Sequence, residues 1–145
     1  TLYSIYIFTN QNLCTMPAKK NIHILLVEDD VFLVNIYKTK FELEGFKITH
    51  AEDGEAGIAE AKKKNPDIIL LDILMPKMDG FTALEKLKED KKTAGIPVIM
   101  LTNLGQKDDV QKGLDLGADD YLIKAHFKPS DTVKKVLDVI EKHKK

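Results

Sequence analysis

Five short apolar runs recur along the chain, each with the length of a β-strand. They cover residues 22–27 (IHILLV), 46–51 (FKITHA), 67–71 (DIILL), 97–101 (PVIML) and 120–123 (DYLI). The first, third and fourth runs are almost continuously apolar, which is typical of strands that are covered on both faces. The pattern therefore predicts a sheet buried between two layers of other elements.

Amphipathic segments of helical length alternate with these runs. The clearest apolar stripe follows the spacing i, i+3, i+4 and i+8 through Leu33, Ile36, Tyr37 and Phe41. A similar stripe near the end of the chain contains Val133, Val136, Leu137 and Ile140. Both are expected of helices that bury one face. Three more helices are expected over residues 55–64, 81–90 and 106–116.

The predicted helices also have suitable end signals. Gly45 and Gly117 follow two of them and Pro66 follows a third, while Asp53 and Ser130 are expected N-caps. Five strands that alternate with five helices imply right-handed crossovers, and therefore an α/β fold with a parallel sheet and helices on both faces. The periodicity does not give the order of the strands in the sheet.

Length and charge narrow the class of protein. The chain of 145 residues is large enough for one domain with one substantial core. A net charge of −1 gives no overall field that would attract nucleic acid or an anionic membrane, so neither is an expected partner. The only cysteine, Cys14, excludes an internal disulfide and a cysteine-based zinc site, which fits a cytoplasmic location.

The first twenty residues do not follow the strand and helix pattern. Residues 1–15 carry no charge, lack the basic start of a secretory signal, and are too few to span a bilayer. We expect residues 1–20 to be a flexible leader or an artificial extension, or sequence upstream of a true start at Met16, and residues 21–145 to be the folded domain. An extra strand or a partner-binding arm is the alternative.

Polar residues that can bind or accept a phosphoryl group stand where four of the five strands end. These residues are Glu28, Asp29 and Asp30 after the first strand, Asp72 after the third, Thr102 after the fourth and Lys124 after the fifth. Ligands of open parallel sheets bind beyond the carboxyl ends of the strands. Any one of these residues alone would be an ordinary cap, turn or surface residue, as we expect for Asp30, but their joint placement favours a common site.

The combination of these side chains indicates phosphate chemistry. Three carboxylates in one crevice repel one another unless a cation lies among them, and oxygen ligands favour Mg²⁺ or Mn²⁺. A divalent ion, a lysine and a hydroxyl can together stabilise the charge of a phosphoryl group. A carboxylate can itself be the nucleophile, which would give an acyl phosphate.

Four segments in this order resemble the receiver domain of two-component response regulators. They are VEDD (27–30), LLDILMPKMDG (70–80), PVIMLTN (97–103) and GADDYLIK (117–124), and the likeness extends over residues 22–143. The resemblance implies a flavodoxin-like fold with five helices and a sheet of order 2-1-3-4-5. It is nearest to stand-alone receivers of the chemotaxis-regulator type.

The resemblance also implies roles for the acids. Asp72 matches the phosphoacceptor, which receives a phosphoryl group from the phosphohistidine of a sensor histidine kinase or a phosphotransfer protein. Glu28 and Asp29 match the acidic pair that holds Mg²⁺. In the family pattern Asp29 and Asp72 bind the ion directly, together with the backbone carbonyl of Leu74, while Glu28 acts mostly through water.

Three further residues match the family's switch. Thr102 corresponds to the hydroxyl that moves toward the phosphoryl group, Tyr121 to the aromatic residue that rotates with it, and Lys124 to the lysine that pairs with a phosphoryl oxygen. The implied result is a changed surface around the fourth helix, fifth strand and fifth helix that controls a partner protein, with homodimerisation on phosphorylation. Such a domain is a self-catalysed phosphoacceptor and not an enzyme in the usual sense.

Three positions depart from the family pattern. The acidic pair is Glu28-Asp29 where Asp-Asp is commoner, and Asn103 stands where alanine is preferred, which leaves the phosphoryl lifetime open. Ala125 replaces the proline that usually follows the lysine through a cis bond. A cis Lys124–Ala125 bond would cost about 2.5–4 kcal/mol, so this bond is either strained or trans, with a rearranged loop through His126 and Phe127 that could displace Lys124.

Other readings stay open beside the leading one. A pseudo-receiver would bind its partner without phosphorylation. A phosphatase of the haloacid dehalogenase type would need a second acid where Leu74 stands, and a flavodoxin would need a phosphate-binding loop after the first strand. Because no further domain is expected after the last helix, we expect a stand-alone regulator or the receiver of a larger hybrid kinase.

Overall fold

The strands assemble into one parallel sheet, and their order confirms the expectation. The computed structural model describes residues 22–103, 107–126 and 128–144. In this part of the chain the sheet order is β2-β1-β3-β4-β5, and every neighbouring pair is parallel. The fold is therefore the flavodoxin-like α/β fold. The expectation for residues 1–20 lies outside the described residues.

Strands and helices alternate as the sequence predicts. The strands are β1 (His23–Val27), β2 (Lys47–Ala51), β3 (Ile68–Asp72), β4 (Val98–Thr102) and β5 (Asp120–Ile123). The helices are α3 (Val31–Leu43), α4 (Gly54–Lys64), α5 (Gly80–Glu89), α6 (Lys107–Asp115) and α7 (Pro129–His143), with a short 3₁₀ helix η2 (Lys124–His126) after β5. Predicted and observed boundaries agree within a few residues, and residue 106, the expected start of one helix, is not among the described residues.

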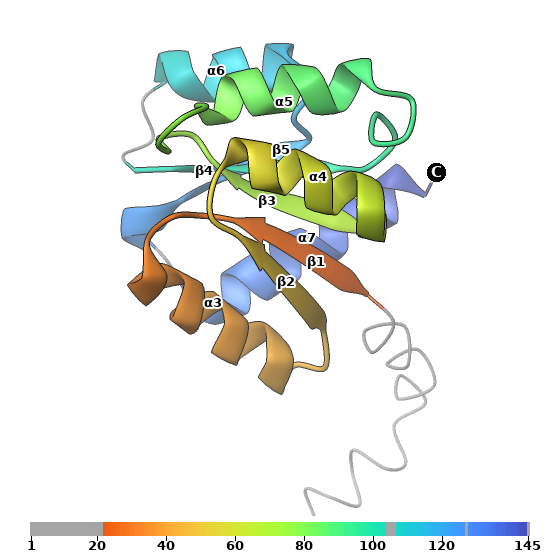
Figure 1. The fold of residues 1–145 in the computed structure, drawn as a ribbon. Helices are drawn as coiled ribbons and strands as arrows, with labels where there is room; N and C mark the ends of the chain where they lie inside the picture. Colours follow the sequence, from red (N-terminus) through yellow and green to blue (C-terminus); the bar gives the residue numbers. More distant parts are fainter. Residues whose placement is uncertain (1–21, 104–106, 127, 145) are drawn as a thin grey trace, which may run out of the picture.

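Helices cover both faces of the sheet, so the described residues form two apolar cores. Figure 1 shows α4, α5 and α6 on one face and α3 and α7 on the other. Alternate residues of β3 supply the two cores: Ile68 and Leu70 pack toward α3 and α7, whereas Ile69 and Leu71 pack on the opposite side. Strands buried on both faces need apolar residues at successive positions, which explains their continuous apolar runs.

Most of the predicted helix ends are confirmed. The side chain of Asp53 accepts a hydrogen bond from the Ala56 backbone N–H, and Gly45 and Gly117 have positive φ angles of 93° and 109°. The prediction for Ser130 is wrong, because α7 begins at Pro129, its N-cap position is Lys128, and no side chain caps this end. Proline suits this first helical position, since it has a preset φ and no N–H that would need a partner.

None of the helices in the described part of the chain combines the length and the apolar character that a bilayer crossing requires.

Candidate functional site

The order of the strands brings the predicted site residues to one edge of the sheet. β3 lies between β1 and β4, and β4 lies between β3 and β5. Asp72 and Thr102 are the last residues of β3 and β4, while Glu28 and Lys124 directly follow β1 and β5. Because the strands are parallel, all four residues stand at the carboxyl edge, where ligands of this architecture bind.

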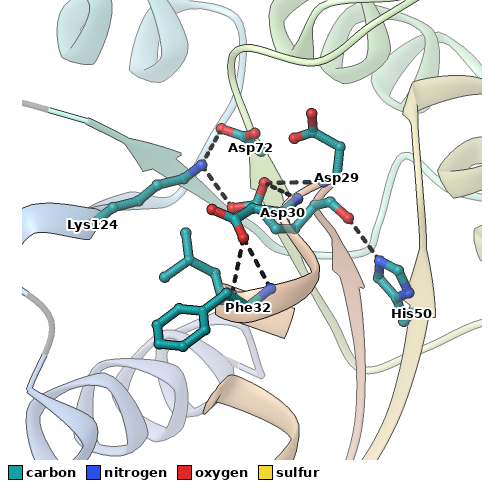
Figure 2. A network of polar contacts seen from close by, with 8 residues as sticks. Asp29, Asp30, Phe32, His50, Asp72 and Lys124 are labelled. Carbon is teal, nitrogen blue, oxygen red and sulfur yellow. Dashed lines mark hydrogen bonds and ion pairs between the residues drawn. The ribbon is translucent and has the colours of Figure 1, made fainter. Parts of the chain in front are cut away.

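A lysine joins two buried acids at this edge. The Lys124 Nζ lies 2.6 Å from Glu28 Oε1 and 2.8 Å from Asp72 Oδ1 (Figure 2). Glu28 is completely buried and Asp72 is 3% exposed, while only 11% of the Lys124 side chain is exposed. Charges with so little access to water are stable only when they are paired. This site therefore depends on the three side chains together.

The same burial changes how these groups bind protons. Burial, with a smaller contribution from the neighbouring Asp72 carboxyl, raises the pKa of Glu28 to about 7, although Lys124 acts in the opposite direction. Burial alone would lower the pKa of Lys124, but its hydrogen bonds to Asp72 and Glu28 and their charges outweigh this effect and raise that pKa. Lys124 therefore stays charged at neutral pH, and Glu28 holds a proton far more readily than an exposed glutamate does.

A third acid completes a group that could bind a cation. Asp29 is exposed, and one oxygen from each of Glu28, Asp29 and Asp72 lies within 4.8 Å of the others. Two oxygens that bind one Mg²⁺ at its usual distances are at most about 4.2 Å apart. The three carboxylates are therefore close enough to share one ion after small movements, directly or through water. A set made only of oxygen ligands fits Mg²⁺ or Mn²⁺ and would not suit a softer metal.

The turn after β3 brings α5 against the strand end that carries Asp72. The Gly80 N–H donates to the Ile73 carbonyl at 2.7 Å, and a Cβ at Gly80 would overlap the backbone carbonyl oxygen of Asp72. Lys77 within the turn has a positive φ of 68°. The backbone approaches so closely at Gly80 that only glycine is permitted there.

The predicted metal ligand Leu74 lies in the same turn. Its side chain is 67% exposed two residues beyond Asp72. The assignment of its backbone carbonyl as a ligand stays a prediction.

The two predicted switch residues lie on β4 and β5, outside the ion pairs of the buried acids. Thr102 is buried at the end of β4, and Tyr121 is half-buried on β5. The Lys135 Nζ lies 5.1 Å from the centre of the Tyr121 ring and donates to the Tyr121 carbonyl at 3.0 Å. Among the described residues, neither Thr102 nor Tyr121 joins the network of Glu28, Asp72 and Lys124.

The departures near Thr102 and Lys124 leave the lysine in reach of the acids. No described residue has a cis peptide bond, so the Lys124–Ala125 bond is trans, and the chain continues as the 3₁₀ helix η2. Lys124 nevertheless contacts both buried carboxylates. Asn103 is exposed beside Thr102, while Phe127 lies outside the described residues.

One residue next to the site was not predicted from the sequence. His50, the penultimate residue of β2, has its ring Nε2 2.7 Å from the backbone carbonyl oxygen of Glu28. The strand and helix pattern of the sequence gives this histidine no role at the site. The signal that could have found it is its place one residue before the end of a strand that pairs with the acid-bearing β1.

Comparisons with known proteins agree with this arrangement. Residues 24–137 match the protein family described as the response regulator receiver domain. The chain is 46% identical over 101 residues to the DNA-binding dual master transcriptional regulator RpaA of Synechocystis sp., an alignment that covers 70% of this chain and 42% of the relative. It is 44% identical over 101 residues to the response regulator PleD of Caulobacter vibrioides, covering 70% of this chain and 22% of PleD. The chain thus spans less than half the length of these relatives.

Solved structures include similar single domains. The CheY-like response regulator receiver domain protein from Methanospirillum hungatei superimposes with a TM-score of 0.78 at 28% identity, covering 85% of this chain and 96% of that protein. The receiver domain of the Francisella response regulator 1452 gives a TM-score of 0.77 at 32% identity, with coverages of 84% and 98%.

Proposed function

The chain belongs to the response regulator receiver domain family, and on this premise we propose that it is a phosphorylation-driven switch with Asp72 as its phosphoacceptor. Receiver domains are phosphorylated by histidine kinases and are phosphoacceptors, unlike conventional enzymes. The observation that carries the proposal is the buried Asp72 carboxylate, which Lys124 contacts at 2.8 Å beside Glu28 and Asp29. The switch we propose spans residues 21–145, a range that contains the family match over residues 24–137.

The proposed reaction transfers one phosphoryl group. An Asp72 carboxylate oxygen attacks the phosphorus of a phosphohistidine, the P–N bond breaks as the P–O bond forms, and the departing imidazole keeps the electron pair and takes up a proton. The product is an acyl phosphate on Asp72. Lys124 already lies at the carboxylate, so a small movement of its ammonium group would pair it with a phosphoryl oxygen.

Glu28, Asp29 and Asp72 form the acidic triad that is typical of the receiver magnesium site. We propose that Asp29 and Asp72 bind Mg²⁺ or Mn²⁺ together with the Leu74 carbonyl, and that Glu28 acts through water. When bound, the ion supplies positive charge to the phosphoryl oxygens. In the structure Lys124 holds the two buried acids of this triad, so the lysine must share them with an incoming cation.

The strands that adjoin the site are the basis for the surface change that we propose as the output of the switch. We propose that Thr102 moves toward the phosphoryl group and that Tyr121 follows, which changes the surface of α6, β5 and α7. Control of a partner protein, with homodimerisation on phosphorylation, is the proposed result. RpaA is described as DNA-binding, but the net charge of −1 gives this chain no field that would favour nucleic acid. The cytoplasmic location stays a prediction that rests on the single cysteine.

The test is the intact mass of the protein after incubation with acetyl phosphate and Mg²⁺. We expect the wild type to gain the mass of one phosphoryl group. The gain should be absent when EDTA removes the metal and when Asp72 is changed to Asn. Asp138→Asn, at an exposed acid of α7, is the matched control and should gain the same mass. Equal gain by Asp72→Asn would show that another residue is the acceptor.

The second candidate is a pseudo-receiver that binds its partner constitutively. Its support is Asn103 beside Thr102 and the trans Lys124–Ala125 bond, both of which depart from the family pattern. A wild type that binds Mg²⁺ but gains no phosphoryl mass from acetyl phosphate, or from a kinase that phosphorylates other receivers, would favour this candidate.

A further inference from the structure

We propose that His50 is a positioning residue for the cation-binding acids. Its imidazole N–H holds the peptide unit between Glu28 and Asp29, and thereby fixes the direction in which both carboxylates leave the sheet. This inference rests on the proposed function, because it concerns the cation site of the same switch.

The hydrogen-bond ladder between β1 and β2 stops next to Glu28. β1 and β2 pair in parallel as far as Val27 and Ala51, and the Glu28 N–H still donates to the Ala51 carbonyl at 3.1 Å. Beyond that bond β1 turns toward α3, so the Glu28 carbonyl has left the regular ladder. The His50 side chain reaches this carbonyl at 2.7 Å (Figure 2). Since a carbonyl oxygen can only accept, Nε2 must carry the hydrogen.

The opposite side of the same peptide group is also held by a hydrogen bond. The Asp29 N–H donates to Glu28 Oε2 at 3.0 Å. The carbonyl of Glu28 and the N–H of Asp29 belong to one planar peptide group and point in opposite directions. His50 holds one side of this plane and the Glu28 carboxylate holds the other. Rotation of the plane would break both hydrogen bonds together.

The orientation of this peptide plane affects the carboxylates of the proposed cation site. Glu28 is completely buried, and its second carboxylate oxygen, Oε1, lies 2.6 Å from Lys124. Asp29 is exposed, so the core does not fix its side chain, and its carboxylate direction depends on the backbone that carries it. Without the His50 bond, the Glu28–Asp29 plane would be held from one side only. We expect the two carboxylates then to meet Asp72 less often in the arrangement that binds a cation.

The experiment measures Mg²⁺ binding to the unphosphorylated full chain by isothermal titration calorimetry, with no phosphoryl donor present. His50→Phe keeps a flat ring but removes the donor. His50→Gln places an amide N–H close to the position of the imidazole Nε2, whereas His50→Asn is too short to reach it. The matched control is His23→Phe, because His23 bonds Thr49 at the far end of the same strand pair at 2.7 Å.

We expect His50→Phe and His50→Asn to weaken Mg²⁺ binding about tenfold, the low end of the usual effect of residues that support metal ligands. His50→Gln should stay within about threefold of the wild type, and His23→Phe should leave the affinity unchanged. If His50→Phe does not fold, the comparison of Gln with Asn decides. Wild-type affinity in His50→Asn, or equal weakening in Gln and Asn, would overturn the proposal. Failure of the wild type to accept phosphate would refute the proposed switch but leave this comparison intact.

Discussion

The two edges of the sheet use acidic residues in opposite ways. At the amino edge the exposed Asp67 and Asp119 accept hydrogen bonds from the backbone N–H groups of His23 and Val98, at 2.7 and 2.9 Å. At the carboxyl edge Glu28 and Asp72 are buried, and each has an oxygen whose partner is the ammonium group of Lys124. The amino-edge acids are satisfied by backbone groups of the fold, whereas the carboxyl-edge acids share one cationic side chain.

This difference separates a structural edge from the edge at which we propose phosphoryl chemistry. A hydrogen bond to a strand's first N–H fixes a carboxylate within the backbone framework and leaves little to exchange. An ammonium group can be shared with a phosphoryl oxygen or replaced by a metal ion. Burial makes such an exchange consequential, because a buried carboxylate left without a partner is costly. The reactivity that we propose for the carboxyl edge would thus come from partners that can be substituted.

The largest loss of stability is expected from a substitution at Gly80, where the backbone packs closely against the strand end that carries Asp72. A Cβ at Gly80 would overlap the Asp72 carbonyl, and the obstacle is backbone that cannot rotate away. We expect Gly80→Ala to lower the free energy of unfolding by about 4 kcal/mol in urea denaturation. Gly95→Ala, in the loop before β4, is the control, since a Cβ there meets nothing within 4 Å. Similar stability of the two variants would show that the turn after β3 can adjust.

Removal of the shared cation should have the next largest effect. Lys124→Met leaves Glu28 and Asp72 buried without their common partner, so we expect a loss of about 3 kcal/mol in metal-free buffer at pH 8. Lys62→Met breaks the exposed Lys62–Asp90 pair, which spans 3.0 Å, and should cost less than about 1 kcal/mol. If both variants lose the same free energy of unfolding in urea denaturation, burial does not increase the contribution of the Lys124 ion pairs to stability.

The two edges should also respond to pH with opposite signs. Burial first, then Asp72, raises the pKa of Glu28 from 4.5 to about 7, so between these values the folded protein binds more protons than the unfolded chain. Stability from Glu28 is fully present below pH 4.5 and is lost as the pH rises through 7. Burial, with the charges of Lys47 and Lys64, lowers the pKa of His23 from 6.5. Stability from His23 is present above pH 6.5 and is lost as the pH falls.

Urea denaturation in EDTA from pH 4.5 to 8 would separate these contributions. The wild-type free energy of unfolding minus that of Glu28→Gln should fall by about 2 kcal/mol as the pH rises across this range. The corresponding difference for His23→Gln should rise with pH. A flat difference for Glu28→Gln would contradict the raised pKa.

Much of this arrangement follows from strand periodicity alone. A run such as DIILL has to lie in the sheet interior, and in a parallel sheet its last residue meets the ends of its neighbours. That logic predicts that Glu28, Asp72 and Lys124 lie together.

The contacts that could not be predicted depend on side-chain reach and on competing backbone signals. Strand alternation says which face His50 occupies but not that its ring extends past the last ladder bond to the Glu28 carbonyl. Nor does it say that Lys124 pairs with the buried Glu28 and Asp72. At α7 the fixed φ of Pro129 prevailed over the capping side chain of Ser130.

The smallest effect is expected at the amino edge, where a single acid supports a single backbone group. Asp67→Asn keeps an acceptor oxygen for the His23 N–H but removes its charge, so we expect a loss of about 0.5–1 kcal/mol in urea denaturation. Mg²⁺ affinity, measured by titration calorimetry, should be unchanged, because the acids that could hold the ion lie at the other ends of the strands. A several-fold change in Mg²⁺ affinity would show that strain passes along β1 from His23 to Glu28, and that the two edges are coupled parts of one site.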